Sequence, residues 1–565
     1  MPADVAEDSL ELAIELLEAA EPDSESYPFP RLRRLGRSER RTFRTILLEN
    51  QHFRITVVPD LGGRILRWED MRSHQDIWDF NERIDLLEAG GRGIELAAGL
   101  QIRTRFGDRL NSMGPVANAP DYTEESESPS GLWMGEVCGD GLSLNWRLAA
   151  PHDSPFLELE VRAFNRSLEP VPYNGGIAVG GGSWRKSGDL WAWTSEGGTL
   201  AVECPYLDYS EDGGLYRFNR HRYLAPHQLD AWTAKIYPSG IGDSLRGASL
   251  SAHAGWNGEE MRIQGIESYS GKAIVLTKSA RTLEMPLEVS RDLLLKIPLD
   301  SLKDEIEELV VLDADRAERL RAPAASIVST ARADEDPRPA CLEPDAEIRQ
   351  LRDAEFDLGL RHLSHLLSGY GRLSMGDFLG AAGAFEQALI FNGEDHLAWW
   401  AKAAAQRKGG AEAEERTELL NAHFLAPLEP VLRAEGFLAS PVHGREKSAV
   451  LGPLEETPEA FVEVACLLLE ANFVQDAARW LTEALLHVDF PVLRYLLAHV
   501  YLELGGMEVD AAEQVQLAIR ENPEPPYPYR RIEFRALAKL AARFPADGSL
   551  RRLLDFAGRF RPLLI

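Results

Sequence analysis

The sequence predicts a large antiparallel β-sandwich followed by an all-α solenoid of paired helices. Short runs of alternating apolar and polar residues, broken by Gly, Pro, Asn and Asp, extend from about residue 45 to 321. Beyond about residue 346, similar helical segments recur at a spacing of 34 residues. We therefore expect four regions: an N-terminal region at 1–44, the sandwich at 45–321, a linker at 322–345 and the helical domain at 346–565.

The N-terminal region combines a predicted amphipathic helix with a basic arm. Leu10, Ile14 and Leu17 share one face of a helix over residues 5–20, with acidic residues on the other face. Three prolines then break the chain, and an arginine cluster follows at 31, 33, 34, 37, 40, 41 and 44. We expect this arm to pair with acidic surface elsewhere in the chain or in a partner subunit.

The first predicted strands enclose a tight turn. Residues 46–49 and 53–58 have strand patterns, and Pro59 ends the second because it cannot donate a ladder hydrogen bond. The turn at 60–63 carries two glycines, so Arg64 lies at the start of the third strand. Further along, residues 157–163 alternate, and Asn165-Arg166-Ser167 turns the chain. A structural meander accounts for this spacing without any functional role.

The linker and the helical domain differ in composition from the sandwich. Residues 322–345 are rich in Ala, Pro and acidic residues, which is typical of an interdomain linker. In the helical domain, Asp476-Ala477-Ala478 recurs as Asp510-Ala511-Ala512, Ala484 as Ala518 and Pro491 as Pro525. This offset is the tetratricopeptide period, and its small residues let paired helices approach closely.

Charge and cysteine usage exclude several classes of function. Lys+Arg 61 against Asp+Glu 90 gives a net charge of −29, which repels nucleic acid and anionic membranes. The four cysteines are far apart and form no C-x-x-C pair, so neither a disulfide framework nor a zinc site is expected. The sequence has no phosphate-binding loop, dinucleotide fingerprint or H-E-x-x-H motif. We expect no cofactor, no metal and a cytoplasmic location.

Several segments resemble a known family. Val58-Pro59-Asp60-Leu61-Gly62-Gly63-Arg64-Ile65, Gly93-Ile94-Glu95 and the G-L-W-M-G-E run at 131–136 are similar to an uncharacterised bacterial family. In that family a galactose-mutarotase-like β-sandwich precedes tetratricopeptide repeats, so the resemblance implies a sugar-related fold. Its members carry a Gly-His pair soon after G-I-E. Residues 96–111 contain no histidine, and this chain departs from the family there.

Seven residues are the candidate site. Sugar sites combine aromatic platforms with a few placed carboxylates, Arg and His. The candidate catalytic acids are Glu95, in an apolar run where burial raises a carboxyl pKa, and Glu267, whose position is similar to that of the mutarotase base. The candidate substrate-binding residues are Arg64, Trp191, Trp193, His221 and His227. Each also has a structural interpretation: core tryptophans, salt-bridged acids and surface histidines.

Two functions follow from these residues. The first is a glycoside hydrolase or sugar epimerase that acts on a small sugar or glycoside with paired carboxylates. The second is a non-catalytic carbohydrate-binding protein whose repeats dock a protein partner or mediate self-association. Loss of the Gly-His pair favours the second, and aromatic and acidic content fits either. The first, an enzyme or enzyme-derived fold, is the function that we expect, and the second is the alternative.

Overall fold

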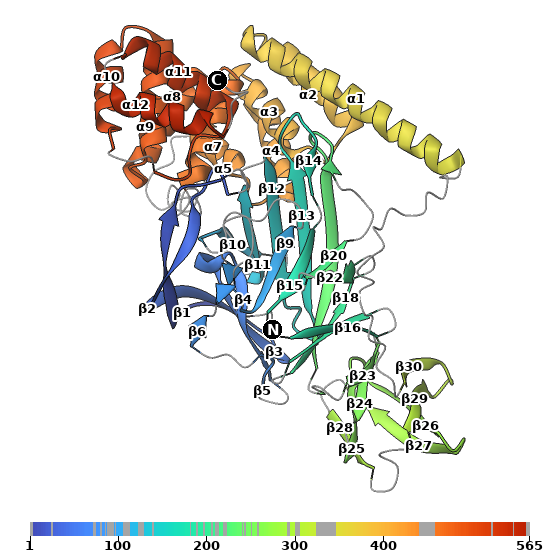
Figure 1. Cartoon of the computed structure of the whole chain (residues 1–565). Coiled ribbons are helices and arrows are strands. Elements are labelled where there is room, and N and C mark those ends of the chain that lie inside the picture. The colour runs from blue at the N-terminus through green and yellow to red at the C-terminus, as the bar shows by residue number, and fades with distance from the viewer. Residues whose placement is uncertain are drawn as a thin grey trace.

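The structure is a computed structural model with three bodies: a two-sheet β-sandwich, a helical domain above it and a smaller β body below it (Figure 1). It describes residues 4–323 and 346–560, apart from 24–25, 72–74, 79–81, 85, 88–94, 97, 105–113, 123–128, 138–140, 174, 181, 188–189, 196–197, 205–206, 210–213, 218–222, 240, 242–244, 250, 257–258, 291–293, 300–305, 440–457, 521–523 and 546. The predicted linker at 322–345 lies almost wholly outside the described residues.

The sandwich packs a ten-stranded sheet against an eight-stranded sheet. The first sheet runs in the order β19 (Leu207–Tyr209), β20 (Gly214–Arg217), β15 (Gly175–Val179), β9 (Leu100–Thr104), β4 (Arg64–Asp70), β3 (Phe53–Val58), β2 (Arg31–Glu49), β1 (Asp4–Ala20) and β6 (Arg83–Ile84), with β5 (Gln75–Asp76) on β4. The second runs β10 (Ala117–Tyr122), β11 (Pro129–Val137), β12 (Leu142–Ala149), β13 (Leu157–Asn165), β22 (Leu229–Ser239), β18 (Thr199–Glu203), β17 (Leu190–Thr194) and β16 (Ser183–Ser187). Two small ladders join β14 (Val171–Pro172) to β21 (Tyr223–Leu224) and β7 (Leu86–Leu87) to β8 (Glu95–Leu96).

One core fills the space between the two large sheets. Phe53 and Trp68 from the first sheet pack with Trp146, Leu159 and Trp193 from the second, and all five side chains are at most 1% exposed. The strand pairs among the described residues of 45–321 are antiparallel, which confirms the predicted class of structure for that range. The alternation predicted at 157–163 is confirmed as well, because the odd-numbered positions of β13 face this core.

The turn after β3 forms as the sequence predicts. A 3-10 turn at Pro59–Leu61 follows the strand, and Gly62 and Gly63 take φ angles of 73° and 67°. An L side chain is strained in this left-handed region, whereas glycine is not. Gly63 also lies against the core, where a Cβ atom would come within 2.7 Å of Trp146 Cζ2.

The prediction of an N-terminal helix is wrong. Residues 4–20 form strand β1, which pairs antiparallel with β2 from Asp4↔Glu49 to Ala20↔Arg31. The segment carries a second, shorter period: Leu12 and Ile14 are buried and alternate with Glu11 and Ala13. A long partner strand decides between the two periods, because strand pairing overrides helix propensity. The region is part of the ten-stranded sheet and not a separate arm.

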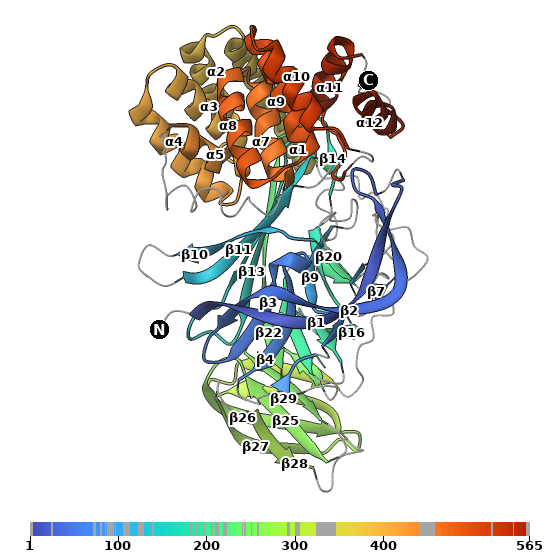
Figure 2. The same cartoon turned by 90° about the vertical axis from the view of Figure 1, so that its left-hand side faces the viewer.

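The arginine cluster pairs mainly with acids close to it. Arg40 lies 3.7 Å from Glu11 and 3.1 Å from Glu82, and Arg31 lies 2.7 Å from Asp23. The β1–β2 hairpin does reach the helical domain, but it does so through the residues of its loop (Figure 2). There the Tyr27 ring lies 4.8 Å from the Phe560 ring, and Glu21 lies 2.7 Å from Arg559.

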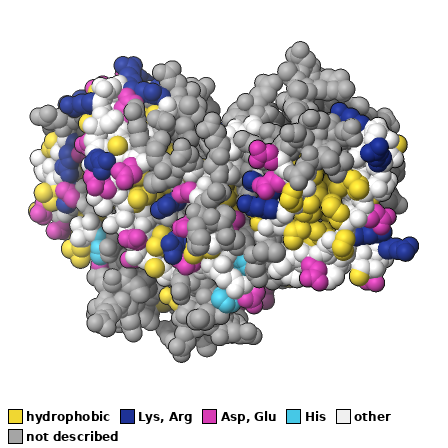
Figure 3. All heavy atoms as spheres, turned by 90° about the horizontal axis from the view of Figure 1, so that it is seen from below, with side chains coloured by type: hydrophobic (Ala, Val, Ile, Leu, Met, Phe, Trp, Pro, Cys, Tyr) yellow, Lys and Arg dark blue, Asp and Glu magenta, His cyan; other side chains and the backbone are white. Residues whose placement is uncertain are grey.

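The second β body was not predicted as a separate unit. Residues 245–323 form two four-stranded sheets around a core of their own: β23 (Leu245–Ala248), β24 (Ala252–Trp256), β25 (Glu260–Gly265) and β28 (Leu294–Pro298); and β27 (Thr282–Val289), β26 (Tyr269–Thr277), β29 (Ile306–Asp313) and β30 (Glu318–Pro323). The predicted single sandwich over 45–321 is thus two β bodies. Seen from below (Figure 3), hydrophobic side chains gather in one patch on the side where Figure 1 places this body.

Eleven helices follow among the described residues, which confirms the change from strands to helices. They are α1 (Ala346–Ser374), α2 (Phe378–Phe391), α3 (His396–Lys408), α4 (Glu412–Leu425), α5 (Pro430–Ala439), α7 (Pro458–Glu470), α8 (Val474–His487), α9 (Pro491–Leu504), α10 (Glu508–Leu517), α11 (Arg531–Arg543) and α12 (Gly548–Gly558). The repeated alanines at 477, 484, 511 and 518 are all at most 1% exposed. Within the described ranges, none of these helices has the length and apolar content needed to cross a bilayer.

Candidate functional site

Arg64 is a buried structural residue. It starts β4, is 1% exposed, and its Nη1 donates to the carbonyl oxygens of Leu96 and Ala98, each at 3.1 Å. These contacts connect the backbone at Leu96 and Ala98 to the double-glycine turn at 60–63. The guanidinium is therefore buried and donates to backbone oxygens of the β8 region.

The two predicted catalytic acids are not brought together. The backbone of Glu95 lies in β8, and its side chain lies outside the described residues. Glu267 belongs to the second β body, where its side chain is 53% exposed and lies 3.1 Å from Ser251 Oγ and 3.8 Å from Arg319. Both views place β4 and β25 in different bodies, so Arg64 and Glu267 do not share a pocket.

Eight of the nine tryptophans before residue 257 belong to the cores of the β bodies, and Trp133 lies on the outer face of the eight-stranded sheet. Trp191 and Trp193 share one side of β17, as predicted, but that side faces the sandwich core, where they are 2% and 0% exposed. The Trp193 ring lies edge-on to Trp78 at 6.0 Å. The nine tryptophans before residue 257 are all at most 9% exposed: 68, 78, 133, 146, 184, 191, 193, 232 and 256. The platform role predicted for Trp191 and Trp193 is wrong.

The outer face of the eight-stranded sheet carries a group of polar side chains that contact one another. Trp133, Arg147 and Glu160 are cross-strand partners on β11, β12 and β13. Asp121 of β10 accepts from Trp133 Nε1 at 3.2 Å and from Arg147 Nε at 2.6 Å. Arg162 donates to Glu160 at 2.6 Å. We call these five residues the ledge.

The ledge adjoins the helical domain. The Arg162 guanidinium lies over the Trp133 ring at 4.9 Å and also near the Phe424 ring of α4 at 5.6 Å. It donates to the carbonyl oxygen of Leu425 at 2.8 Å, where a cation complements the helix C-terminus. The side chains of Asp121, Arg147 and Glu160 are 18–25% exposed, so they remain open to solvent.

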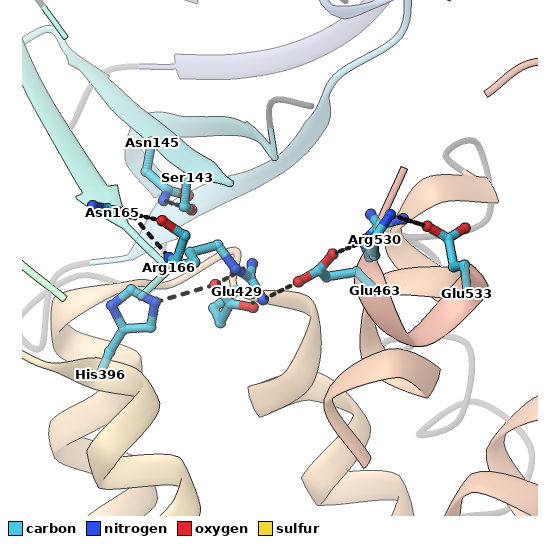
Figure 4. A network of polar contacts seen from close by, with 10 residues as sticks. Ser143, Asn145, Asn165, Arg166, His396, Glu429, Glu463, Arg530 and Glu533 are labelled. Atoms are coloured by element: carbon cyan, nitrogen blue, oxygen red, sulfur yellow. Dashed lines mark hydrogen bonds and ion pairs between the residues drawn. The ribbon is translucent and has the colours of Figure 1, made fainter. Parts of the chain in front are cut away.

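A buried ionic network fastens the sandwich to the repeats next to the ledge. Arg166 follows β13 and projects between two acids of the helical domain, as Figure 4 shows. Its Nη1 lies 2.9 Å from both carboxylate oxygens of Glu429, and its Nη2 lies 2.8 Å from Glu463. His396 Nε2 contacts Glu429 at 3.2 Å, and Arg530 continues the network from Glu463. Arg166, Glu429 and His396 are at most 3% exposed, and Arg530 at the other end is 12% exposed.

The network keeps its charges although it is buried. Burial opposes ionisation of Glu429, but Arg166 and His396 outweigh it and hold the pKa of Glu429 below its ordinary value. Burial likewise opposes the charge on Arg166, yet Glu429 and Glu463 raise its pKa above the ordinary value. The Arg166–Glu429 pair is therefore an ionic contact between the two domains.

His227 lies beside this network, in a cluster that the sequence did not reveal. It is 3% exposed, and its Nδ1 lies 2.8 Å from Asp395 Oδ2. His362 Nε2 approaches the same oxygen at 3.0 Å. Burial opposes ionisation of Asp395, but His227 and His362 together hold its pKa below its ordinary value. The other predicted histidine, His221, lies outside the described residues.

Sequence reasoning missed most of these functional groups for different reasons. The ledge has a local signal. Asp121, Arg147, Glu160 and Arg162 are polar positions of alternating strands, and Trp133 lies in the G-L-W-M-G-E run at 131–136. Arg166 stands in a predicted turn, where its charge alone did not indicate burial. His362 and Asp395 have no local signal at all, because their partner His227 comes from a distant strand turn.

The comparisons with known proteins give loose structural matches only. No protein-family model matches the chain, and no curated protein matches it. A TPR-domain-containing protein from Parabacteroides distasonis is 12% identical and covers 93% of this chain and 97% of its own, with a TM-score of 0.31. A galactose 1-epimerase from Lactobacillus acidophilus is 10% identical and covers 35% and 95%, with a TM-score of 0.22. A polysaccharide lyase is 9% identical and covers 83% and 82%, with a TM-score of 0.21.

Proposed function

We propose that the chain is a non-catalytic carbohydrate-binding protein, with the sugar on the ledge and the repeats as a fixed protein scaffold. The observation that carries the proposal is the arrangement of Asp121, Trp133, Arg147, Glu160 and Arg162 side by side on successive strands. Carboxylates and guanidinium groups fixed beside an aromatic residue are the groups that orient sugar hydroxyls.

Ion pairing on the ledge favours binding over hydrolysis. Glycoside hydrolysis needs one carboxyl group that donates a proton and a second that is free to act as base or nucleophile. On the ledge, Asp121 is committed to Arg147 at 2.6 Å and Glu160 to Arg162 at 2.6 Å. Neither carboxylate is free for proton transfer, whereas both have further lone pairs that accept from sugar hydroxyls.

The junction supports a scaffold role for the repeats. Arg166 and Arg162 both reach from the sheet into the helical domain, so the ledge has a fixed position relative to the helices. Several apolar side chains of the helical domain are exposed, including Met375 in the α1–α2 turn at 75%, Leu379 at 68% and Leu420 at 70%. They offer contact area for an apolar segment of a partner protein.

Binding and turnover measurements on the same protein test the proposal. We expect soluble oligosaccharides from a panel to bind in calorimetric titrations, and Asp121→Asn and Arg147→Met to weaken binding by about 1–3 kcal/mol each. The matched control is Arg321→Met, a surface arginine on the second β body. We expect no hydrolysis of nitrophenyl glycosides and no mutarotation above background.

Two outcomes contradict the proposal. If Asp121→Asn and Arg147→Met both leave the sugar affinity unchanged, the sugar-binding site is not on the ledge. If the protein turns over a sugar substrate and Glu95→Gln or Glu267→Gln abolishes this activity, the chain is a two-carboxylate enzyme, the first of the two functions.

A further inference from the structure

Three metal-ligating side chains meet at the junction of the sandwich and the repeats. His227 precedes β22, His362 belongs to α1, and Asp395 caps the N-terminus of α3. One ligand atom from each residue lies within 4.8 Å of the other two. Their side chains are 4%, 2% and 0% exposed. Two imidazoles and one carboxylate form a donor set that suits divalent transition metals such as zinc, iron and cobalt.

We propose that His227, His362 and Asp395 bind one divalent transition-metal ion, which joins the sandwich to the first repeats. The ligand atoms are His227 Nδ1, His362 Nε2 and Asp395 Oδ2, since these three converge, with Oδ2 at 2.8 Å and 3.0 Å from the two nitrogens. A fourth position is left for water, as at other three-ligand zinc sites.

The second polar atom of each helical ligand is already fixed. His362 Nδ1 lies 3.0 Å from the Ala388 carbonyl oxygen, and Asp395 Oδ1 accepts from the Ala398 backbone N–H at 2.9 Å. A metal-binding histidine usually donates its other ring N–H to a carbonyl or carboxylate, which sets the tautomer and the ring orientation. With Nδ1–H donated to Ala388, loss of the Nε2 proton leaves a His362 lone pair that points to the centre of the cluster.

His227 is held just as firmly, through its backbone. Its N–H donates to the Asn165 carbonyl oxygen at 2.9 Å, and its own carbonyl oxygen accepts from Asn392 Nδ2 at 2.7 Å. Its φ of 56° lies in the left-handed region, which a non-glycine residue adopts only where its surroundings fix it. The Asn165 and Asn392 contacts come from the two domains, so the ring is positioned by both.

Two of the three ligand pairs are already close to the spacing that a bound ion needs. The third pair, the two histidine nitrogens, lies within 4.8 Å. Four ligands at about 2.05 Å in a tetrahedron lie about 3.3 Å from one another. The two contacts at 2.8 Å and 3.0 Å therefore open by a few tenths of an ångström. A bound ion takes the place of the protons in those two hydrogen bonds.

Metal analysis of the full chain tests this site. The protein is produced without a polyhistidine tag in medium supplemented with Zn²⁺ or Co²⁺, because a buried site fills during folding. We expect about one ion per chain after dialysis against a weak chelator, and intense visible absorption from the Co²⁺ form, as four-coordinate Co²⁺ shows. His227→Gln and His362→Gln should each reduce the metal content at least tenfold.

A matched control separates this cluster from its neighbours. His396 adjoins Asp395 in sequence and is equally buried, but it contacts Glu429 and not the cluster. His396→Gln should therefore retain the ion. If the cluster variants do not fold, the Co²⁺ spectrum of the wild type is the deciding measurement. Ligation by two histidines and an aspartate gives visible absorption without the charge-transfer band of a cysteine thiolate. A metal-free wild type from both media overturns the proposal, as does an ion that persists in both cluster variants.

Discussion

Tyr27, in the loop of the first hairpin, stacks on Phe560 at the end of the described chain, with ring centroids 4.8 Å apart and ring planes inclined by 18°. The Tyr27 hydroxyl also donates to the Pro528 carbonyl oxygen, and its ring lies 6.1 Å from Tyr527. The sandwich therefore holds the repeats at their C-terminal end as well as through the Arg166 network.

Removing the Tyr27 ring tests this second attachment. Tyr27 is 6% exposed, so Tyr27→Ala should lower the free energy of unfolding by about 3–5 kcal/mol, the usual range for a buried aromatic residue. Urea unfolding followed by circular dichroism at helix wavelengths measures the change. Tyr122→Ala is the control, since Tyr122 is 61% exposed and its removal should change stability by less than about 0.5 kcal/mol. Equal effects of the two substitutions would contradict the attachment.

The Arg166 network predicts a large cost for breaking one buried ion pair. Arg166→Met leaves Glu429 and Glu463 buried without their shared cation and should cost about 3–5 kcal/mol. Arg321→Met removes a cation whose side chain is 51% exposed, and this change should cost less than about 1 kcal/mol. Adding Glu429→Gln to Arg166→Met should recover part of the loss, and strictly additive effects would show that the pair is not coupled.

Gly63 and Gly36 separate backbone strain from steric overlap. Both have φ of 67°, so alanine costs about 1–2 kcal/mol at either position. At Gly63 the added Cβ also meets Trp146 and Met134 within 2.8 Å, whereas at Gly36 nothing lies within 4 Å. Gly63→Ala should therefore destabilise the sandwich by about 1–3 kcal/mol more than Gly36→Ala does. Tryptophan fluorescence during urea unfolding measures the difference, and its absence would contradict the close packing of the turn.

His499 predicts a pH dependence of stability. Burial is the main cause that lowers its pKa to about 4, from an ordinary value of 6.5. The unfolded chain therefore takes up the proton first as the pH falls, and stability is lost between about pH 6.5 and 4. A tenfold difference in proton affinity between the folded and unfolded chain corresponds to about 1.4 kcal/mol, so the loss amounts to as much as about 3 kcal/mol.

Substitution of His499 should remove that loss. His499→Gln should flatten the decline of the unfolding free energy from pH 6.5 to 4, measured by urea titrations at each pH. The control, His152→Gln, replaces a histidine whose side chain is 36% exposed. A decline that His499→Gln leaves unchanged would assign the acid sensitivity to other groups.

Glu267 distinguishes the ledge from the site that the sequence predicted. Its side chain is 53% exposed and its ion pair with Arg319 is long, at 3.8 Å. Glu267→Gln should therefore change stability by less than about 0.5 kcal/mol and leave sugar binding unaffected. The same calorimetric titrations that compare Asp121→Asn with wild type measure this. Weaker sugar binding by Glu267→Gln would contradict the ledge and indicate a sugar site on the second β body.

The sequence predicted those features that local periodicity encodes. The strands at 53–58 and 157–165, the double-glycine turn and the switch to helices follow from alternation, turn residues and a repeat spacing. Residues 4–20 fit two periods at once, and only the pairing of β1 with β2 decides between them.

Functional residues were harder to predict because their partners are distant in the chain. Trp191 and Trp193 were correctly placed on one side of a strand, but no local signal says whether that side faces the core or a ligand. His227 was singled out among surface-type loop residues, whereas its partners His362 and Asp395 come from helices of the other domain. The placement of a charged group at a domain junction depends on the tertiary fold, which short motifs do not contain.

Attachment at both ends changes how the repeats unfold. In an open array each repeat contacts only its neighbours, so terminal repeats fray first and unfolding proceeds stepwise. Here the first helices are held through Asp395 and Glu429, and the last through Phe560. Neither end frays without breaking contacts to the sandwich, so the solenoid and the sandwich should lose structure in one cooperative transition. Folding then requires contacts between chain ends that are far apart in sequence, which slows it relative to a free repeat array.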